Sequence, residues 1–186
     1  MNINENQRTR LTKQLIKESF LSLLENNEIN KISIKSICEN AQINRSTFYK
    51  HYGSQYDVLS EIENALINQS RQILGNEFMK TNVDACLSYE TYCRYIEQNK
   101  KIYQLLTDNV GSNFPKKIME HQQIQFLLQK QLPDYYSEED TPYVYTFVVY
   151  GIYQLIVEWL NTDCKRPTHE IAGLIHKLLD NICVKQ

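Results

Sequence analysis

Residues 33–52, SIKSICENAQINRSTFYKHY, decide the fold of the N-terminal part of the chain. Ser33 is a favourable N-cap for a short helix, whose apolar side would hold Ile34, Ile37, Cys38 and Ala41. A turn over 42–44 leads into a second helix predicted over 45–52. Two short helices joined by a turn of about three or four residues form a helix-turn-helix, whose second helix is sized for the major groove of DNA.

The second predicted helix carries a high density of hydrogen-bond donors. The residues expected to point inward are Ile37, Cys38, Ile43, Phe48 and Tyr52. Arg can bond guanine with two hydrogen bonds, Ser and Thr suit base edges or phosphates, and Tyr, Lys and His suit phosphates. We therefore predict a DNA-binding surface formed by Ser33, Lys35, Asn44, Arg45, Ser46, Thr47, Tyr49, Lys50 and His51. Base readout is expected from Arg45, Ser46 and Thr47. Positioning of the DNA backbone is expected mainly from Tyr49, Lys50, His51, Ser33 and Lys35.

Helical periodicity dominates the rest of the sequence, without strand-like alternation or internal repeats. Further helices are predicted over 8–26, 54–79, 83–98, 100–108, 114–132, 141–161 and from Pro167-Thr168 onward. Only 5 Gly and 4 Pro occur in 186 residues, which excludes a disordered chain and an all-β fold with many tight turns. The sequence therefore predicts an all-α protein of about nine helices.

The distribution of charge is more informative than its sum. The 20 Lys and Arg and 22 Asp and Glu give a net charge of -2. Residues 1–52 hold 8 basic and 5 acidic side chains, a net of +3, and the remaining 12 basic and 17 acidic side chains give -5. The predicted DNA-binding part is therefore the basic part of an acidic chain.

The cysteines and the N-terminus together indicate a cytoplasmic protein. The five cysteines form no CxxC pair and no zinc-finger spacing, so we expect reduced thiols, no metal and no other cofactor. The first residues lack a basic region followed by an apolar core, which argues against a signal peptide. Residues 143–160 are strongly apolar, but Gln154, Glu158 and four tyrosines favour a helix buried in protein over a membrane span.

Two segments, RTRLTKQLIKESFLSLL (8–24) and ISIKSICENAQINRSTFYKHYGSQYDVL (32–59), resemble the tetracycline-repressor (TetR) family of transcription regulators. The matching features are Ser33 at the second helix, the Thr47-Phe48-Tyr49 centre, Tyr52 and Leu59, within about residues 8–66. The resemblance implies a helix-turn-helix DNA-binding domain over 1–53 and a connecting helix over 54–79. It also implies a ligand-sensing and dimerisation domain over 80–186.

Three positions depart from the family pattern. The family usually has Ala where this chain has Cys38, which is a conservative change, and Gly where it has Gln42. If that backbone adopts a positive φ, Gln42 costs about 1 kcal/mol relative to Gly. The family also usually has Lys, a phosphate contact, where this chain has Gln55, which puts that contact in question.

The C-terminal region predicts a homodimer. The apolar stripe from Ile171 to Ile182 and the apolar helix at 143–160 exceed what one subunit of this size can cover. The stretch FVVYGIYQLIVEWL also resembles one branch of the same family, which implies a four-helix bundle between two subunits. The predicted interface comprises Gly151, Leu155, Trp159, Ile171, Leu174, Ile175, Leu178, Leu179 and Ile182.

An effector site is expected within about residues 83–160. Ten of the 13 tyrosines follow residue 88, and Tyr92, Ile96 and Tyr103 are predicted to wall a pocket for an aromatic or cationic small molecule. The same tyrosines would equally serve as core or interface residues. The helix over 54–79 would transmit a ligand-induced tilt, so the predicted function is a repressor that a small molecule releases from a palindromic operator.

Two alternatives stay open. A DNA-binding protein of the same fold would act through a protein partner, without a small-molecule effector. A helical enzyme is the second, but the sequence has no GxSxG, P-loop, HExxH or Rossmann fingerprint. We therefore expect a non-enzymatic regulator whose partners are double-stranded DNA and a second copy of itself.

Overall fold

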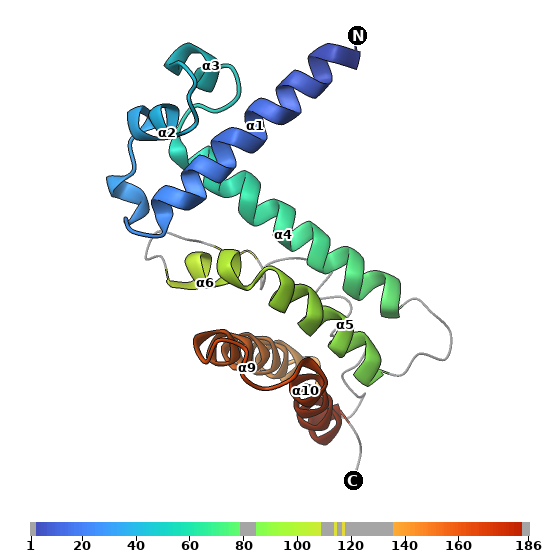
Figure 1. Cartoon of the computed structure of the whole chain (residues 1–186). Coiled ribbons are helices and arrows are strands. Elements are labelled where there is room, and N and C mark those ends of the chain that lie inside the picture. The colour runs from blue at the N-terminus through green and yellow to red at the C-terminus, as the bar shows by residue number, and fades with distance from the viewer. Residues whose placement is uncertain (1–2, 79–84, 109–113, 115–116, 118–135, 184–186) are drawn as a thin grey trace. The chain divides into compact units, whose positions relative to one another are not determined.

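The described part of this computed structural model, residues 3–78, 85–108, 114, 117 and 136–183, is helical (Figure 1). Its elements are α1 (Ile3–Leu24), the 3-10 helix η1 (Ile29–Lys31), α2 (Ile34–Asn40), α3 (Arg45–Tyr49), α4 (Gln55–Phe78), α5 (Ala85–Gln98), α6 (Lys100–Asp108), α9 (Thr141–Asn161) and α10 (Thr168–Cys183). These residues hold eight α-helices and no strand, so the all-α prediction is confirmed. Of the helix predicted over 114–132, only residues 114 and 117 are among the described residues, and the rest of it lies outside them.

Helix boundaries follow the sequence pattern where periodicity is strong and differ where it is weak. α6 and α9 have the predicted bounds, whereas α1 begins at Ile3 rather than near Arg8. α3 ends at Tyr49, although backbone hydrogen bonds from His51 and Tyr52 to the Phe48 carbonyl continue the turn. The helix η1 was not predicted, because a helix of three residues has no period to detect.

The described contacts divide the chain into two units, each considered by itself below. Unit 1 comprises Met1–Leu66 and Leu105–Ser112, and unit 2 comprises Ile67–Gln104 and Asn113–Gln186. The division therefore runs through α4, within the helix predicted to connect the two domains.

The core of unit 1 fixes α2 and α3 against the longer helices. In unit 1, α1 packs on α2, and α2 packs on α3 (Figure 1). Ser19 Oγ on α1 donates a buried hydrogen bond of 2.9 Å to the Ile37 carbonyl on α2. The largest fully buried apolar side chains of this core are Ile16, Phe20, Ile37, Phe48, Leu106 and Val58. The predicted inward residues Cys38 and Tyr52 are buried as well, whereas Ile43 is half-buried.

The turn between α2 and α3 has the positive φ at Gln42 that was considered for this position from the sequence. Gln42 has φ 53°, in the left-handed region that glycine adopts most readily. The turn closes through the Ile43 N–H, which donates to the Cys38 carbonyl at 3.0 Å. A side chain at this position costs about 1 kcal/mol relative to glycine.

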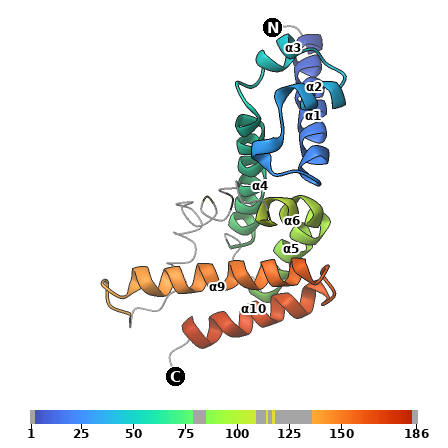
Figure 2. The same cartoon turned by 90° about the vertical axis from the view of Figure 1, so that its left-hand side faces the viewer.

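Unit 2 is built around α5, α9 and α10. α10 packs against α5, and α9 and α10 run side by side (Figure 2). The connection between α9 and α10 is tied down by three hydrogen bonds. Lys100 Nζ lies 2.6 Å from Asp163 Oδ1, Gln104 Nε2 donates to the Leu160 carbonyl, and Trp159 Nε1 donates to the Arg166 carbonyl. By length and composition, α9 is apolar enough to cross a membrane, with a hydropathy of 1.2.

Candidate nucleic-acid interface

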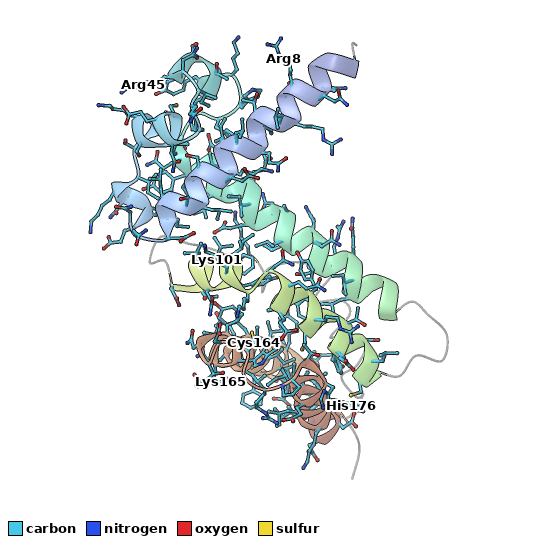
Figure 3. The ribbon with its side chains drawn as sticks, viewed as in Figure 1. Arg8, Arg45, Lys101, Cys164, Lys165 and His176 are labelled. Carbon is cyan, nitrogen blue, oxygen red and sulfur yellow. The ribbon has the colours of Figure 1, made fainter. Side chains whose placement is uncertain are left out.

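One buried ring anchors the short helix α3. Phe48 is fully buried, and its ring contacts the rings of Tyr49 and Tyr52 at centroid distances of 5.8 Å each. The opposite side of the helix faces solvent, and Figure 3 shows the Arg45 side chain pointing outward from unit 1. Of the predicted contact residues, those exposed are Ser33, Lys35, Asn44, Arg45, Ser46, Tyr49 and Lys50, and those half-buried are Thr47 and His51. The structure thus brings the predicted residues onto accessible positions of two adjacent helices.

Asn44 caps the N-terminus of α3. Its Oδ1 accepts a hydrogen bond of 2.8 Å from the backbone N–H of Thr47. The same oxygen accepts from Thr47 Oγ1 at 2.8 Å and from Ser46 Oγ at 2.7 Å. An N-cap of this kind stabilises a helix by about 1 kcal/mol, which is substantial for a helix of five residues. The sequence singled out Asn44 as a contact residue but gave no sign of this shared acceptor.

The start of α2 is capped reciprocally. Ser33 Oγ accepts from the Ser36 N–H at 3.0 Å, and Ser36 Oγ accepts from the Ser33 N–H at 3.2 Å. Lys35 points into solvent and lies 3.8 Å from Glu39, a distance at which an exposed pair contributes little. Ser33 and Lys35 are therefore both accessible to a phosphate at this helix end.

Glu61 on α4 neutralises two lysines of α1. Lys13 Nζ lies 2.7 Å from Glu61 Oε2, and Lys17 Nζ lies 3.4 Å from Glu61 Oε1. Lys13 also lies 5.2 Å from the centroid of the Tyr52 ring, three residues after the end of α3. Burial of the carboxyl group opposes ionisation, but the hydrogen bond and charge of Lys13 and the charge of Lys17 prevail and lower the pKa of Glu61. These two lysines thus brace the domain and are not free cations.

The start of α4 is occupied by a carboxylate. Asp57 Oδ2 accepts hydrogen bonds from the backbone N–H groups of Gly53 at 2.8 Å and Ser54 at 3.0 Å. A Cβ at Gly53 would lie 3.1 Å from this oxygen, so glycine permits the close approach. Because Gln55 replaces the family lysine and Asp57 covers these donors, the start of α4 is poorly suited to hold a phosphate.

The predicted effector residues lie together in unit 2. Tyr103 and Ile96 are buried, and Tyr103 Oη lies 3.0 Å from Ser70 Oγ. Burial raises the pKa of Tyr92 to about 12, although hydrogen bonding to Ser70 opposes the rise. The Tyr103 ring also makes edge contacts with Tyr95 and Phe114, at centroid distances of 6.3 Å and 5.4 Å. The tyrosine cluster is therefore polar at its hydroxyls and closely packed at its rings.

The predicted dimer residues divide between the inside and the outside of unit 2. Those buried within the unit are Trp159, Ile171, Ile175 and Leu179, those half-buried are Leu155, Leu174 and Ile182, and those exposed are Gly151 and Leu178. α10 turns its buried stripe toward α5 of the same chain. The exposed apolar surface of α9 was not singled out from the sequence, and it comprises Tyr143, Phe147 and Tyr150. Their spacing of three and four residues places them on one side of the helix.

The C-terminal region decides the family of the chain. Residues 87–181, just over half of the sequence, match a family model described as the transcriptional regulator C-terminal region of the TetR type. The chain belongs to the TetR family of transcriptional regulators. This TetR-family chain is 31% identical over 100 residues to the HTH-type dhaKLM operon transcriptional activator DhaS of Lactococcus lactis subsp. lactis (strain IL1403). The match covers 50% of this chain and 48% of DhaS, so it spans about half the length of that relative.

Solved structures share the fold of this TetR-family chain. A TetR transcriptional regulator from Streptococcus agalactiae 2603V superposes with a TM-score of 0.71 at 20% identity, over 95% of this chain and 98% of that one. The fatty acid degradation regulator FadR from Bacillus halodurans superposes with a TM-score of 0.64 at 13% identity, over 90% of this chain and 94% of that one. The dihydroxyacetone kinase operon activator DhaS gives 0.59 at 20% identity, over 92% and 96%.

The Glu61 contacts predict a pH-dependent contribution to stability. The pKa of Glu61 is lowered in the folded state, so its contribution is present above the unfolded pKa of about 4.3 and is lost as the pH falls through the folded value. Since the groups are partly exposed, Glu61→Gln should lower the free energy of unfolding by about 0.5–1 kcal/mol at pH 7. The difference from the wild type should shrink as the pH falls below about 4.

Urea unfolding at several pH values measures this difference. The matched control is Glu39→Gln, which removes the same charge from an exposed pair at 3.8 Å and should cost less than about 0.3 kcal/mol. Equal losses in the two variants would contradict a special role for Glu61.

Proposed function

We propose that this TetR-family regulator binds a palindromic operator as a homodimer, with α3 in the major groove. The observation that supports the proposal most directly is the division of α3 between a buried Phe48 and an outward Arg45 beside exposed Ser46 and Lys50. A dimer with two-fold symmetry would place its two α3 helices on half-sites about 34 Å apart, or slightly more. Such a protein acts in the cytoplasm, where the DNA is.

Selection from randomised duplexes tests operator binding directly. The full-length protein should select duplexes that share a palindromic sequence. Arg45→Ala should lower affinity for that sequence by about 1–3 kcal/mol and relax the preference at one base pair. Lys50→Ala should weaken binding to all sequences alike and reduce the slope of log K against log salt by about one.

Titrations at several salt concentrations measure both effects. Lys165→Ala is the matched control, because it removes the same charge from an exposed position in unit 2 and should change neither affinity nor slope. If Arg45→Ala left both affinity and base preference intact, the assignment of α3 as the reading helix would be wrong.

The exposed aromatic surface of α9 supports the dimer. Phe147 is 69% exposed and Tyr143 is 78% exposed, on a helix with a single charged residue, Glu158. Contiguous apolar surface of this kind on a water-soluble protein marks an interaction site. Gly151 lies on the same side of α9, and a Cβ there would meet no atom, so a second helix can approach closely. We therefore infer that α9, with Leu178 of α10, contacts the same surface of a second copy.

Phe147→Glu should convert the dimer into monomers. A carboxylate at this position would be buried against apolar partner surface, and two copies would face each other near the symmetry axis. Sedimentation at micromolar concentration should show a single-chain mass for the variant and twice that mass for the wild type. His169→Glu is the control, because His169 is exposed on the side of α10 opposite Leu178. A stable wild-type monomer would overturn the dimer.

A small-molecule effector is the third element of the proposal. The polar cluster of Tyr92, Tyr103 and Ser70 suits a ligand with both apolar and hydrogen-bonding groups. α4 is continuous from Gln55 to Phe78, so it joins the unit that holds α3 to the unit that holds this cluster. A ligand that favours one tilt of α4 by about 1–3 kcal/mol would change operator affinity by about five- to 150-fold.

A ligand screen by thermal shift, followed by operator titration with each hit, tests this coupling. Hits should raise the melting temperature and weaken operator binding, and Tyr103→Phe should reduce the first effect because it removes one hydroxyl. Ligands that stabilise the protein but leave operator affinity unchanged would refute the coupling.

The direction of regulation separates two candidate functions. We propose a repressor, which acts by occupying its operator. An activator is the second candidate, because the relative DhaS is named as an activator. A reporter under the selected operator distinguishes them, since deletion of the regulator raises expression in the first case and lowers it in the second. The helical enzyme gains no support from these relatives, which are named as regulators.

A further inference from the structure

The hydroxyl hydrogens of Ser46 and Thr47 are already engaged within the protein. Ser46 Oγ lies 2.7 Å and Thr47 Oγ1 lies 2.8 Å from Asn44 Oδ1. An amide oxygen can only accept hydrogen bonds, so each hydroxyl is the donor in its bond. The backbone N–H of Thr47 is a third donor to the same atom, at 2.8 Å. Because a backbone N–H can only donate, this bond fixes which end of the Asn44 amide is the oxygen.

Each hydroxyl therefore offers only the lone pairs of its oxygen to DNA. Phosphate oxygens, guanine N7 and O6, and thymine O4 are all acceptors, and such an oxygen cannot bond to them. The donors in the major groove are the N6 amino group of adenine and the N4 amino group of cytosine. From residue type alone, Ser46 and Thr47 could contact either bases or phosphates. The observed hydrogen bonds favour contacts with the amino groups of adenine or cytosine.

We propose that Asn44 is a positioning residue that makes Ser46 and Thr47 readers of base amino groups in the operator. The inference rests on the proposed DNA binding. DNA as the ligand is indicated independently of the end of α3, by membership of the TetR family and by the outward Arg45.

Neighbouring positions of α3 then have opposite hydrogen-bonding character. The Arg45 guanidinium only donates, so it fits guanine N7 and O6. Ser46 and Thr47 accept, so they fit the adenine or cytosine amino group. Because the Asn44 oxygen is bonded within α3, the amide has only its nitrogen to offer to DNA, and an amide nitrogen is a donor that suits phosphate.

The test uses the full-length protein and the operator recovered by selection. Base pairs whose preference relaxes in Ser46→Ala or Thr47→Val are the pairs that each hydroxyl reads. At these pairs, adenine is replaced by purine or cytosine by 2-pyrimidinone, which removes only the amino group. In separate duplexes, 7-deaza purines remove N7. Amino removal should weaken binding of the wild type about tenfold more than binding of the variant without the hydroxyl. N7 removal should affect the two proteins equally.

Variants of Asn44 distinguish orientation of the hydroxyls from capping alone. Asn44→Asp keeps an acceptor and a good cap, so it should keep the dependence on the amino group while its charge weakens binding to every duplex. Asn44→Ala frees both hydroxyl hydrogens, and the tenfold dependence should fall below about twofold. A merely structural cap would lower affinity for all duplexes alike and leave the ratio unchanged.

Two results would overturn the inference while leaving DNA binding intact. One is that removal of N7 weakens binding of the wild type more than binding of the variants without a hydroxyl, while removal of the amino group does not. The other is a pair of variants, Ser46→Ala and Thr47→Val, that bind the operator with unrelaxed preference at every base pair. If the wild-type protein selected no DNA sequence from the randomised duplexes, the proposed function would be refuted, and this inference with it.

Discussion

The burial of one phenylalanine ring holds α3 in place, and the surface that we propose to bind DNA depends on it. α3 has five residues, whereas isolated helices shorter than about 12–15 residues are marginal in water. Phe48 is fully buried beside Tyr52, and Asn44 closes the other end of the helix. Full burial of such a ring contributes about 1.5–3 kcal/mol.

Several of the positive charges in unit 1 are paired with carboxylates of the same unit. Lys13 and Lys17 share the Glu61 carboxylate, and Lys31 lies 3.0 Å from Glu28. The start of α4, where the family usually has a lysine, carries the Asp57 carboxylate against its backbone donors. The other basic side chains of residues 1–52 are all exposed, and they are Arg8 and Arg10 on α1, Lys35 on α2, and Arg45 and Lys50 at α3. A net charge counted along the sequence overstates the number of cations that DNA can meet.

Sequence patterns predicted what depends on local periodicity. The bounds of α6 and α9 and the burial of Ile37, Cys38 and Phe48 follow from helical spacing alone. The pairing of Lys13 with Glu61 joins residues 48 positions apart, and no pattern within a helix indicates it. Ile171 and Ile175 are buried where α10 packs on α5 of the same chain, which the sequence did not indicate. An apolar stripe on a helix does not show which other helix it faces. The shared acceptor at Asn44 depends on side-chain rotamers, which residue types do not specify.

α3 has a buried side, held by Phe48, and an exposed side with Arg45 and Lys50, and this separation bears on how such regulators diverge. Arg45 and Lys50 are exposed, so substituting them should leave the buried contacts of Phe48 and the stability of the fold largely unchanged. If these residues contact DNA as proposed, operator preference can change without loss of stability. Asn44 is different, because one oxygen serves the helix cap and two neighbouring hydroxyls at once. Under the proposed role of Asn44, a change at this position would alter stability and recognition in the same step. Descendants of this chain are therefore expected to vary at Arg45 first and to retain an acceptor at the cap.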